Sequence, residues 1–207
     1  MSLPDPAVLP ILERDFVLAW RNIKKEDYVG NSMGYQRNQS CVGTTNGAGG
    51  RNVQIFILSP DHVVLHALPG FWHPDDLAHE LELAKVAWRL WRDKSRSDAD
   101  KRTMYSRIVL ADLRFQDPGT YARSDWQSFD KSYQSGKIDQ DTFVRNDFGD
   151  VKRTESGVPI LKPLNVLAHQ RMAARGFLPF EEFDVDAFVE YGQRYYDNNR
   201  DRGRPLK

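Results

Sequence analysis

The sequence has one cysteine, Cys41, among 207 residues. A single thiol cannot form an intramolecular disulfide, and it cannot cycle between a dithiol and a disulfide. Cys41 follows Arg37 by four positions in a glycine-rich segment, so an exposed and partly activated thiol is one interpretation. An incidental or buried cysteine is the simpler interpretation. Because the chain has no redox pair of cysteines, Cys41 by itself is the remaining candidate for a catalytic residue.

The chain also lacks a net charge and any long apolar run. Its 29 basic and 29 acidic residues balance, which removes the electrostatic argument for nucleic acid or an anionic membrane as a partner. No segment approaches the ~20 consecutive apolar residues of a membrane span, and residues 1–6 lack the basic and apolar regions of a signal peptide. As written, the sequence predicts a folded, soluble protein of the cytoplasm. A true start upstream would leave the location open.

Motifs for metals, nucleotides and common nucleophiles are missing as well. The histidines show no H-E-x-x-H or Cys-His ligand spacing. They are His62, His66, His73, His79 and His169. Residues 44–52 have enough glycine to form a nest of backbone amides, yet they lack the lysine and hydroxyl that complete a P-loop. No G-x-S-x-G elbow is present. The sequence therefore predicts no metal site and no cofactor.

Local signals in the first half predict alternating elements. Residues 6–14 read as a short helix that Pro10 kinks or breaks, and residues 15–22 carry an apolar run typical of a buried central strand. Residues 24–52 contain six glycines and predict a long loop, whose role stays open. Residues 53–58 and 63–67 then predict an antiparallel hairpin around a turn.

A long amphipathic helix is expected to follow the hairpin from Pro74 onward. Its apolar positions recur at steps of four, three, four and three, which places them on one helical face. These positions are Leu77, Leu81, Ala84, Trp88 and Trp91.

Beyond a polar boundary at residues 95–101, helical patterns dominate. One apolar stripe predicts a helix that ends at the Asp117-Pro118-Gly119 stop signal. Its members are Met104, Ile108, Ala111 and Phe115. Further helical pieces are expected at residues 124–134, 139–146, 162–175 and 184–196.

The hairpin and helix over residues 53–91 resemble the last strand pair and closing helix of a thioredoxin fold. Residues 3–22 are similar to the end of that family's first long helix and its next strand. The resemblance implies an α/β, thioredoxin-like domain over residues 1–96, incomplete at its N-terminus, with a mainly helical extension over residues 97–207. Two family features are absent: the CxxC pair, and the cis-proline, whose place Val53 takes.

This resemblance implies a non-catalytic protein that acts through binding or structural contacts with a protein partner of unknown identity. The enzymatic alternative is the downstream part of a thiol-disulfide oxidoreductase whose true start and CxxC lie upstream. A third interpretation is a ligand-binding module built on the glycine-rich loop. The helices after residue 96 are expected to pack on the first part, since their apolar stripes need a partner.

Overall fold

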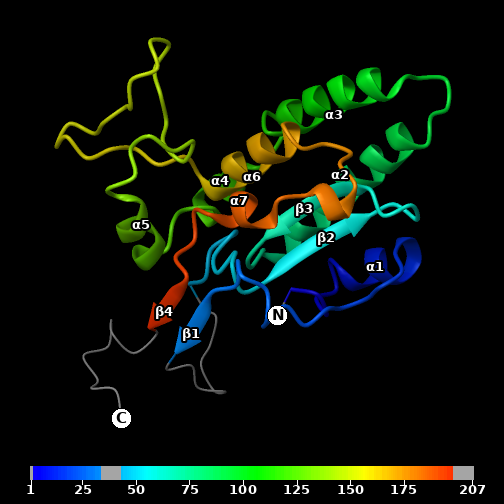
Figure 1. Cartoon of the computed structure of the whole chain (residues 1–207), viewed down its shortest axis with the longest axis horizontal. Coiled ribbons are helices and arrows are strands. Elements are labelled where there is room, and N and C mark those ends of the chain that lie inside the picture. Colours follow the sequence, from blue (N-terminus) through cyan, green and yellow to red (C-terminus); the bar gives the residue numbers. More distant parts are fainter. Residues whose placement is uncertain (1, 34–42, 198–207) are drawn as a thin grey trace.

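The computed structural model describes residues 2–33 and 43–197 of the chain, which form a mixed α/β fold (Figure 1). The described helices are α1 (Leu9–Asp15), α2 (Pro74–Trp91), α3 (Asp98–Asp112), α4 (Pro118–Arg123), α5 (Ser128–Gln134), α6 (Leu164–Ala173) and α7 (Val185–Val189), with a 3-10 turn at Phe180–Glu182. The described strands are β1 (Asn31–Met33), β2 (Gln54–Leu58), β3 (Val64–Pro69) and β4 (Tyr195–Asp197).

The predicted hairpin and long helix are confirmed. β2 and β3 pair antiparallel with Phe56 opposite Ala67, and every residue of β3 is buried. α2 starts with Pro74 in its first turn, where the missing N–H costs no helical hydrogen bond. Its predicted stripe faces the core through Leu77 and Leu81, which are buried. The apolar runs on either side of the turn and the helix-start signals were sufficient here.

One hydrophobic core joins the hairpin to the helices on both sides of residue 96. The main buried cluster runs from Val8 near the N-terminus to Val189 in α7, and it includes Tyr105 of α3 and Met172 of α6. α3 contacts α6, and both α2 and α6 contact β3. In Figure 1, α1 and the chain after it lie on the β2 side of the hairpin, opposite α3 and α6. The core is therefore continuous across the boundary expected from the sequence.

The expected buried strand over residues 15–22 is wrong. The chain after α1 is irregular, and Val17 and Trp20 are 100% and 88% exposed. An apolar run forms a central strand only when other strands lie on both sides of it, and no described strand pairs with this one. The helix before it is shorter than expected. It begins at Leu9, which leaves Pro10 in the first turn and so without a kink.

The expected end of the helix after residue 97 is also wrong. α3 ends at Asp112, and the Asp117-Pro118-Gly119 sequence begins α4, because the Asp117 carboxylate accepts a hydrogen bond from the Gly119 N–H. Phe115, expected on a buried stripe, is 81% exposed. Proline after an aspartate is compatible with a helix start as much as with a stop.

The remaining helical expectations have mixed outcomes. The helix over residues 162–175 is confirmed as α6, and part of 124–134 is helical as α5. Residues 139–146 are not helical. Isolated bridges such as Phe143–Leu161 fold this stretch into the projecting loop that Figure 1 draws in yellow. The last helix stops at Val189, and Tyr195 lies in β4, which pairs parallel to β1.

Candidate functional site

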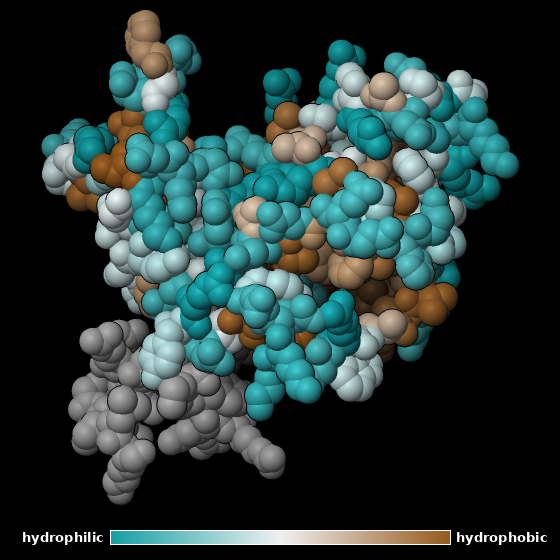
Figure 2. All heavy atoms as spheres, in the orientation of Figure 1, coloured by the Kyte–Doolittle hydropathy of each residue, from teal (hydrophilic) through white to brown (hydrophobic). Residues whose placement is uncertain are grey.

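Two regions of the surface stand out, and the first is the chain that leaves α1. We call residues 16–20 the apolar segment. Phe16 has extended backbone angles and contacts the core, while Val17, Leu18 and Trp20 are exposed. Residues 17–22 make no backbone hydrogen bond to any described residue. Figure 2 shows apolar (brown) atoms gathered where Figure 1 places α1 and the chain after it.

The hairpin edge on the same side of the fold is also open. Among the described strands β2 pairs only with β3, whereas the Val64 N–H of β3 also donates to the Leu178 carbonyl, and the Phe180 N–H donates to the His62 carbonyl just before β3. Unpaired strand edges and exposed extended segments are the surfaces that accept an added strand. The apolar segment and the β2 edge therefore form a candidate docking region.

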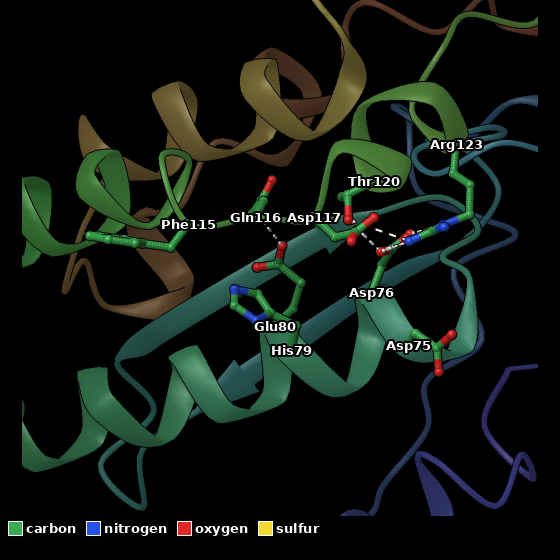
Figure 3. Close-up of a pocket in the computed structure, with 9 residues that line it drawn as sticks. All are labelled: Asp75, Asp76, His79, Glu80, Phe115, Gln116, Asp117, Thr120 and Arg123. Carbon is green, nitrogen blue, oxygen red and sulfur yellow. Dashed lines mark hydrogen bonds and ion pairs between the residues drawn. The ribbon is translucent and has the colours of Figure 1, made fainter.

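The second region is a polar pocket of about 490 Å³ between α2 and the chain that joins α3 to α4 (Figure 3). Its lining residues are Asp75, Asp76, His79, Glu80, Phe115, Gln116, Asp117, Thr120 and Arg123. The four residues from α2 are spaced so that they share one side of the helix. Four of these nine residues are carboxylates and one is an arginine, so the pocket has an excess of negative charge that a ligand would have to tolerate.

Asp76 and Arg123 fix one end of the pocket. Arg123 donates to both carboxylate oxygens of Asp76, at 2.8 and 2.7 Å. Asn46 and Thr120 donate to the same carboxylate at 2.7 and 2.8 Å. Burial raises the pKa of Asp76, but these donors outweigh burial and hold it below its ordinary value. The negative charge of Asp76 is therefore fully engaged by hydrogen bonds within the fold.

A second carboxylate, Glu80, lies on the floor of the pocket and is almost wholly buried. Its Oε2 atom is 2.8 Å from Nε2 of His66 on β3 and 3.5 Å from Nε2 of His169 on α6. Burial raises the pKa of Glu80, and the charge of His169 together with the His66 hydrogen bond lowers it below the ordinary value. Glu80 thus connects three elements of the core.

Asp112, at the end of α3, is shared between two histidines. His79 lies 2.9 Å from its Oδ2 and 3.0 Å from its Oδ1, and His169 lies 3.6 Å from Oδ2. Burial raises the pKa of Asp112, but hydrogen bonds from His169 and His79 lower it well below its usual range. The hydrogen bond to Asp112 raises the pKa of His79, against a lowering by burial. Burial also lowers the pKa of His169, but Glu80 and Asp112 raise it overall.

Two amides complete this cluster. The Gln116 side-chain nitrogen lies 3.3 Å from Glu80 Oε1, from Asp112 Oδ2 and from His169 Nε2. Asn165 donates to the Gln116 oxygen at 2.6 Å, while the Asn165 main-chain carbonyl is 2.8 Å from His169 Nδ1. We call the set Glu80, Asp112, His169, His66 and His79, with these two amides, the histidine–carboxylate cluster.

Sequence reasoning missed this cluster. It treated His66, His79 and His169 as unrelated, and the fold brings them together from β3, α2 and α6. One signal was available: Glu80 and His169 occupy positions beside buried apolar residues of their helices, where a polar side chain requires a partner.

The other predicted positions lie apart from the cluster. His73 contacts the Thr44 carbonyl through Nε2 at 3.0 Å, and His62 sits in the hairpin turn with a positive φ of 60°. Cys41 lies outside the described residues. Within residues 2–33 and 43–197, no group of three or more potential ligands is arranged to hold a metal ion. No helix in the described part of the chain is long and apolar enough to cross a membrane.

Searches against family models, curated proteins and solved structures found no match to this chain.

Proposed function

We propose that this chain is a thioredoxin-like protein without a redox-active cysteine pair, which acts by binding a protein partner rather than by catalysis. A single cysteine removes dithiol chemistry from the chain as written. The order β2, β3, α2 supports the resemblance to the closing hairpin and helix of that fold. The observation that carries a binding role is the apolar segment, in which Val17, Leu18 and Trp20 are exposed and the main chain from residue 17 onward makes no hydrogen bond within the described structure.

The partner that fits this region is an extended strand with apolar side chains. Such a strand satisfies main-chain donors and acceptors and covers apolar side chains at the same time. Complete burial of Val17, Leu18 and Trp20 contributes on the order of 1.5–3 kcal/mol for each side chain. That total is large enough to offset part of the entropy lost on association.

A labelled strand peptide tests this role directly. The probe is a fluorescein-labelled peptide of alternating valine and threonine, and binding is followed by fluorescence anisotropy on the full chain. Trp20→Ser and Val17→Ser should each weaken binding at least several-fold, since both remove apolar area from the contact. Phe148→Ser is the matched control, because Phe148 is 91% exposed but lies in the projecting loop and not in the apolar segment.

Loss of binding in all three variants, or unchanged binding in Trp20→Ser, would rule out the apolar segment as the contact. A peptide of alternating aspartate and threonine should bind far more weakly. Equal binding of the two peptides contradicts recognition of apolar side chains.

A second candidate is supported by the same segment. Residues 15–22 carry the apolar run of a central strand but have no described strand beside them, and a strand from sequence upstream would supply that neighbour. The chain would then be the downstream part of a thiol-disulfide oxidoreductase. The upstream reading frame tests this: an in-frame strand pattern and CxxC would support it, and a stop codon with no intervening start would end it.

A further inference from the structure

We propose that Glu80, Asp112 and His169 form a proton-operated latch, which holds α3 and α6 against α2 while His169 is cationic and loosens them when its Nε2 proton leaves. The latch lies away from the apolar segment and does not depend on the binding role proposed above. It rests on the geometry of the histidine–carboxylate cluster, which joins α2 and β3 to α3 and α6.

The hydrogen bonds of His169 determine which of its protons is lost. Nδ1 lies 2.8 Å from the Asn165 main-chain oxygen, which can only accept, so Nδ1 keeps its hydrogen. The proton that leaves must therefore come from Nε2. Nε2 faces Glu80 at 3.5 Å and Asp112 at 3.6 Å, so its loss leaves a lone pair opposite two carboxylates.

Gln116 is placed to respond to this change. While His169 is cationic, the two N–H groups of Gln116 are free for Glu80 and Asp112, each 3.3 Å away. Once Nε2 is a lone pair, one N–H can donate to it, also across 3.3 Å, but one carboxylate then loses a donor. The amide cannot serve all three acceptors at once, so deprotonation removes the cation between the two carboxylates and leaves one of them with one donor fewer.

Other titratable groups face the cluster from each neighbouring element. From α2, His79 binds Asp112 but is 44% exposed, so its proton exchanges with solvent more easily than that of His169. From β3, His66 binds Glu80, and its buried Nδ1 has no described partner. From α3, Tyr105 is buried, and burial together with the Glu80 charge raises its pKa. None of these three groups donates a hydrogen bond to both Glu80 and Asp112.

The direction of the pH effect follows from the folded and open states. A histidine whose pKa is raised in the folded state stabilises it fully below the ordinary value of 6.5, and the contribution is lost as pH rises through the folded value. Glu80 and Asp112 have lowered values, so their contributions are complete above the ordinary 4.5 and 3.8 and are lost as pH falls. The latch should therefore be firmest between pH 4.5 and pH 6.5.

Hydrogen exchange of the full chain tests the latch. After correction for intrinsic rates, amides of α3 and α6 should open more often as pH rises above 6.5, by up to about tenfold per pH unit for each proton released. The effect should level off once His169 is neutral. In parallel, NMR of the wild-type histidine rings should show His169 titrating above 6.5.

Three variants separate the contributions. His169→Gln should abolish most of the rise in opening, since glutamine does not titrate. His79→Gln should remove only the part of this rise that comes from His79 and leave the part that comes from His169. His62→Asn is the control, because His62 is exposed in the hairpin turn, asparagine tolerates its positive φ, and the pH profile should not change.

Opening of α3 and α6 that does not increase above pH 6.5 overturns the latch, as does a wild-type His169 that titrates below 6.5. Full pH dependence in His169→Gln also overturns it. If that variant fails to fold, the two wild-type measurements decide the question alone.

Discussion

Asp75 and Asp76 are adjacent on α2, yet the structure assigns them very different energetic roles. Asp76 is buried and accepts four hydrogen bonds, two of them from Arg123. Asp75 is exposed; it favours the positive end of the helix dipole and attracts the charge of Arg123 without a hydrogen bond to it. Substituting each by asparagine compares the two positions with the same chemical change.

The cost of Asp76→Asn follows from the donors around it. Arg123 and Thr120 donate to Oδ1, while Arg123 and Asn46 donate to Oδ2. Whichever way the new amide turns, its NH2 group faces donors, so at least one charge-assisted hydrogen bond is replaced by a donor–donor contact. Breaking a buried ion pair costs about 3–5 kcal/mol, but the Arg123 side chain is about a third exposed and can turn towards water.

We therefore expect Asp76→Asn to lower the free energy of unfolding by about 2–3 kcal/mol, and Asp75→Asn by less than ~1 kcal/mol. Urea unfolding followed by circular dichroism, with a common slope for all three proteins, measures both values. Because the pKa of Asp76 is lowered in the folded state, its contribution is complete above the ordinary value of 3.8 and is lost as pH falls. The difference in free energy of unfolding between wild type and Asp76→Asn should therefore become smaller as pH falls.

Equal losses for the two variants would refute this reasoning, because they would show that the Asp76 hydrogen bonds add nothing beyond a helix-end charge. A gap that widens as pH falls would contradict the stated direction of the pKa shift.

Sequence patterns succeeded where the structure is decided by neighbours in the chain. The hairpin depends on apolar runs on either side of the Ser59-Pro60 turn, and α2 depends on Pro74 and a repeating apolar face. Each signal lies within a few residues of the element that it specifies. The order of hairpin and helix was therefore predictable, while the full thioredoxin-like assignment stays a prediction.

The same reasoning failed for the apolar segment because burial is not a local property. Residues 16–20 have the composition of a central strand, but a strand becomes central only through neighbouring strands, and the position of those strands in the sequence is not fixed by this segment. The exposed Val17 and Trp20 show that local preference for extended structure does not create the neighbours it needs.

The histidine–carboxylate cluster was beyond reach for a related reason. Its members come from β3, α2, α3, α6 and the chain that joins α3 to α4, so no spacing motif joins them. What the sequence did contain was a conflict, since Glu80 lies beside Leu77 and Leu81 on the face that must be buried. A charged residue at such a position implies a partner, although only the fold identifies it as His66 and His169.

Three further predictions concern the whole chain. Insulin reduction by dithiothreitol should be no faster with wild type than with Cys41→Ser, because one thiol cannot cycle as a dithiol; turnover that vanishes in that variant would contradict a non-catalytic role. A chain ending at Arg96 should aggregate or melt far below the full chain, since it loses the α3 and α6 side of the core; an unchanged melting temperature would show that the two parts are independent. Gly70→Ala should destabilise the fold by about 2–4 kcal/mol, because φ is +74° and a Cβ atom there would lie 2.4 Å from the Ala48 carbonyl oxygen. That oxygen is main chain and also accepts a hydrogen bond from Phe71, so it cannot move aside without breaking another contact. Gly136→Ala is the matched control, since a Cβ atom there meets nothing within 4 Å and φ is not positive, and thermal melting should place it within about 1 kcal/mol of wild type. Similar melting temperatures for the two alanine variants would mean that the turn after β3 is not held against residues 47–48 as the structure has it.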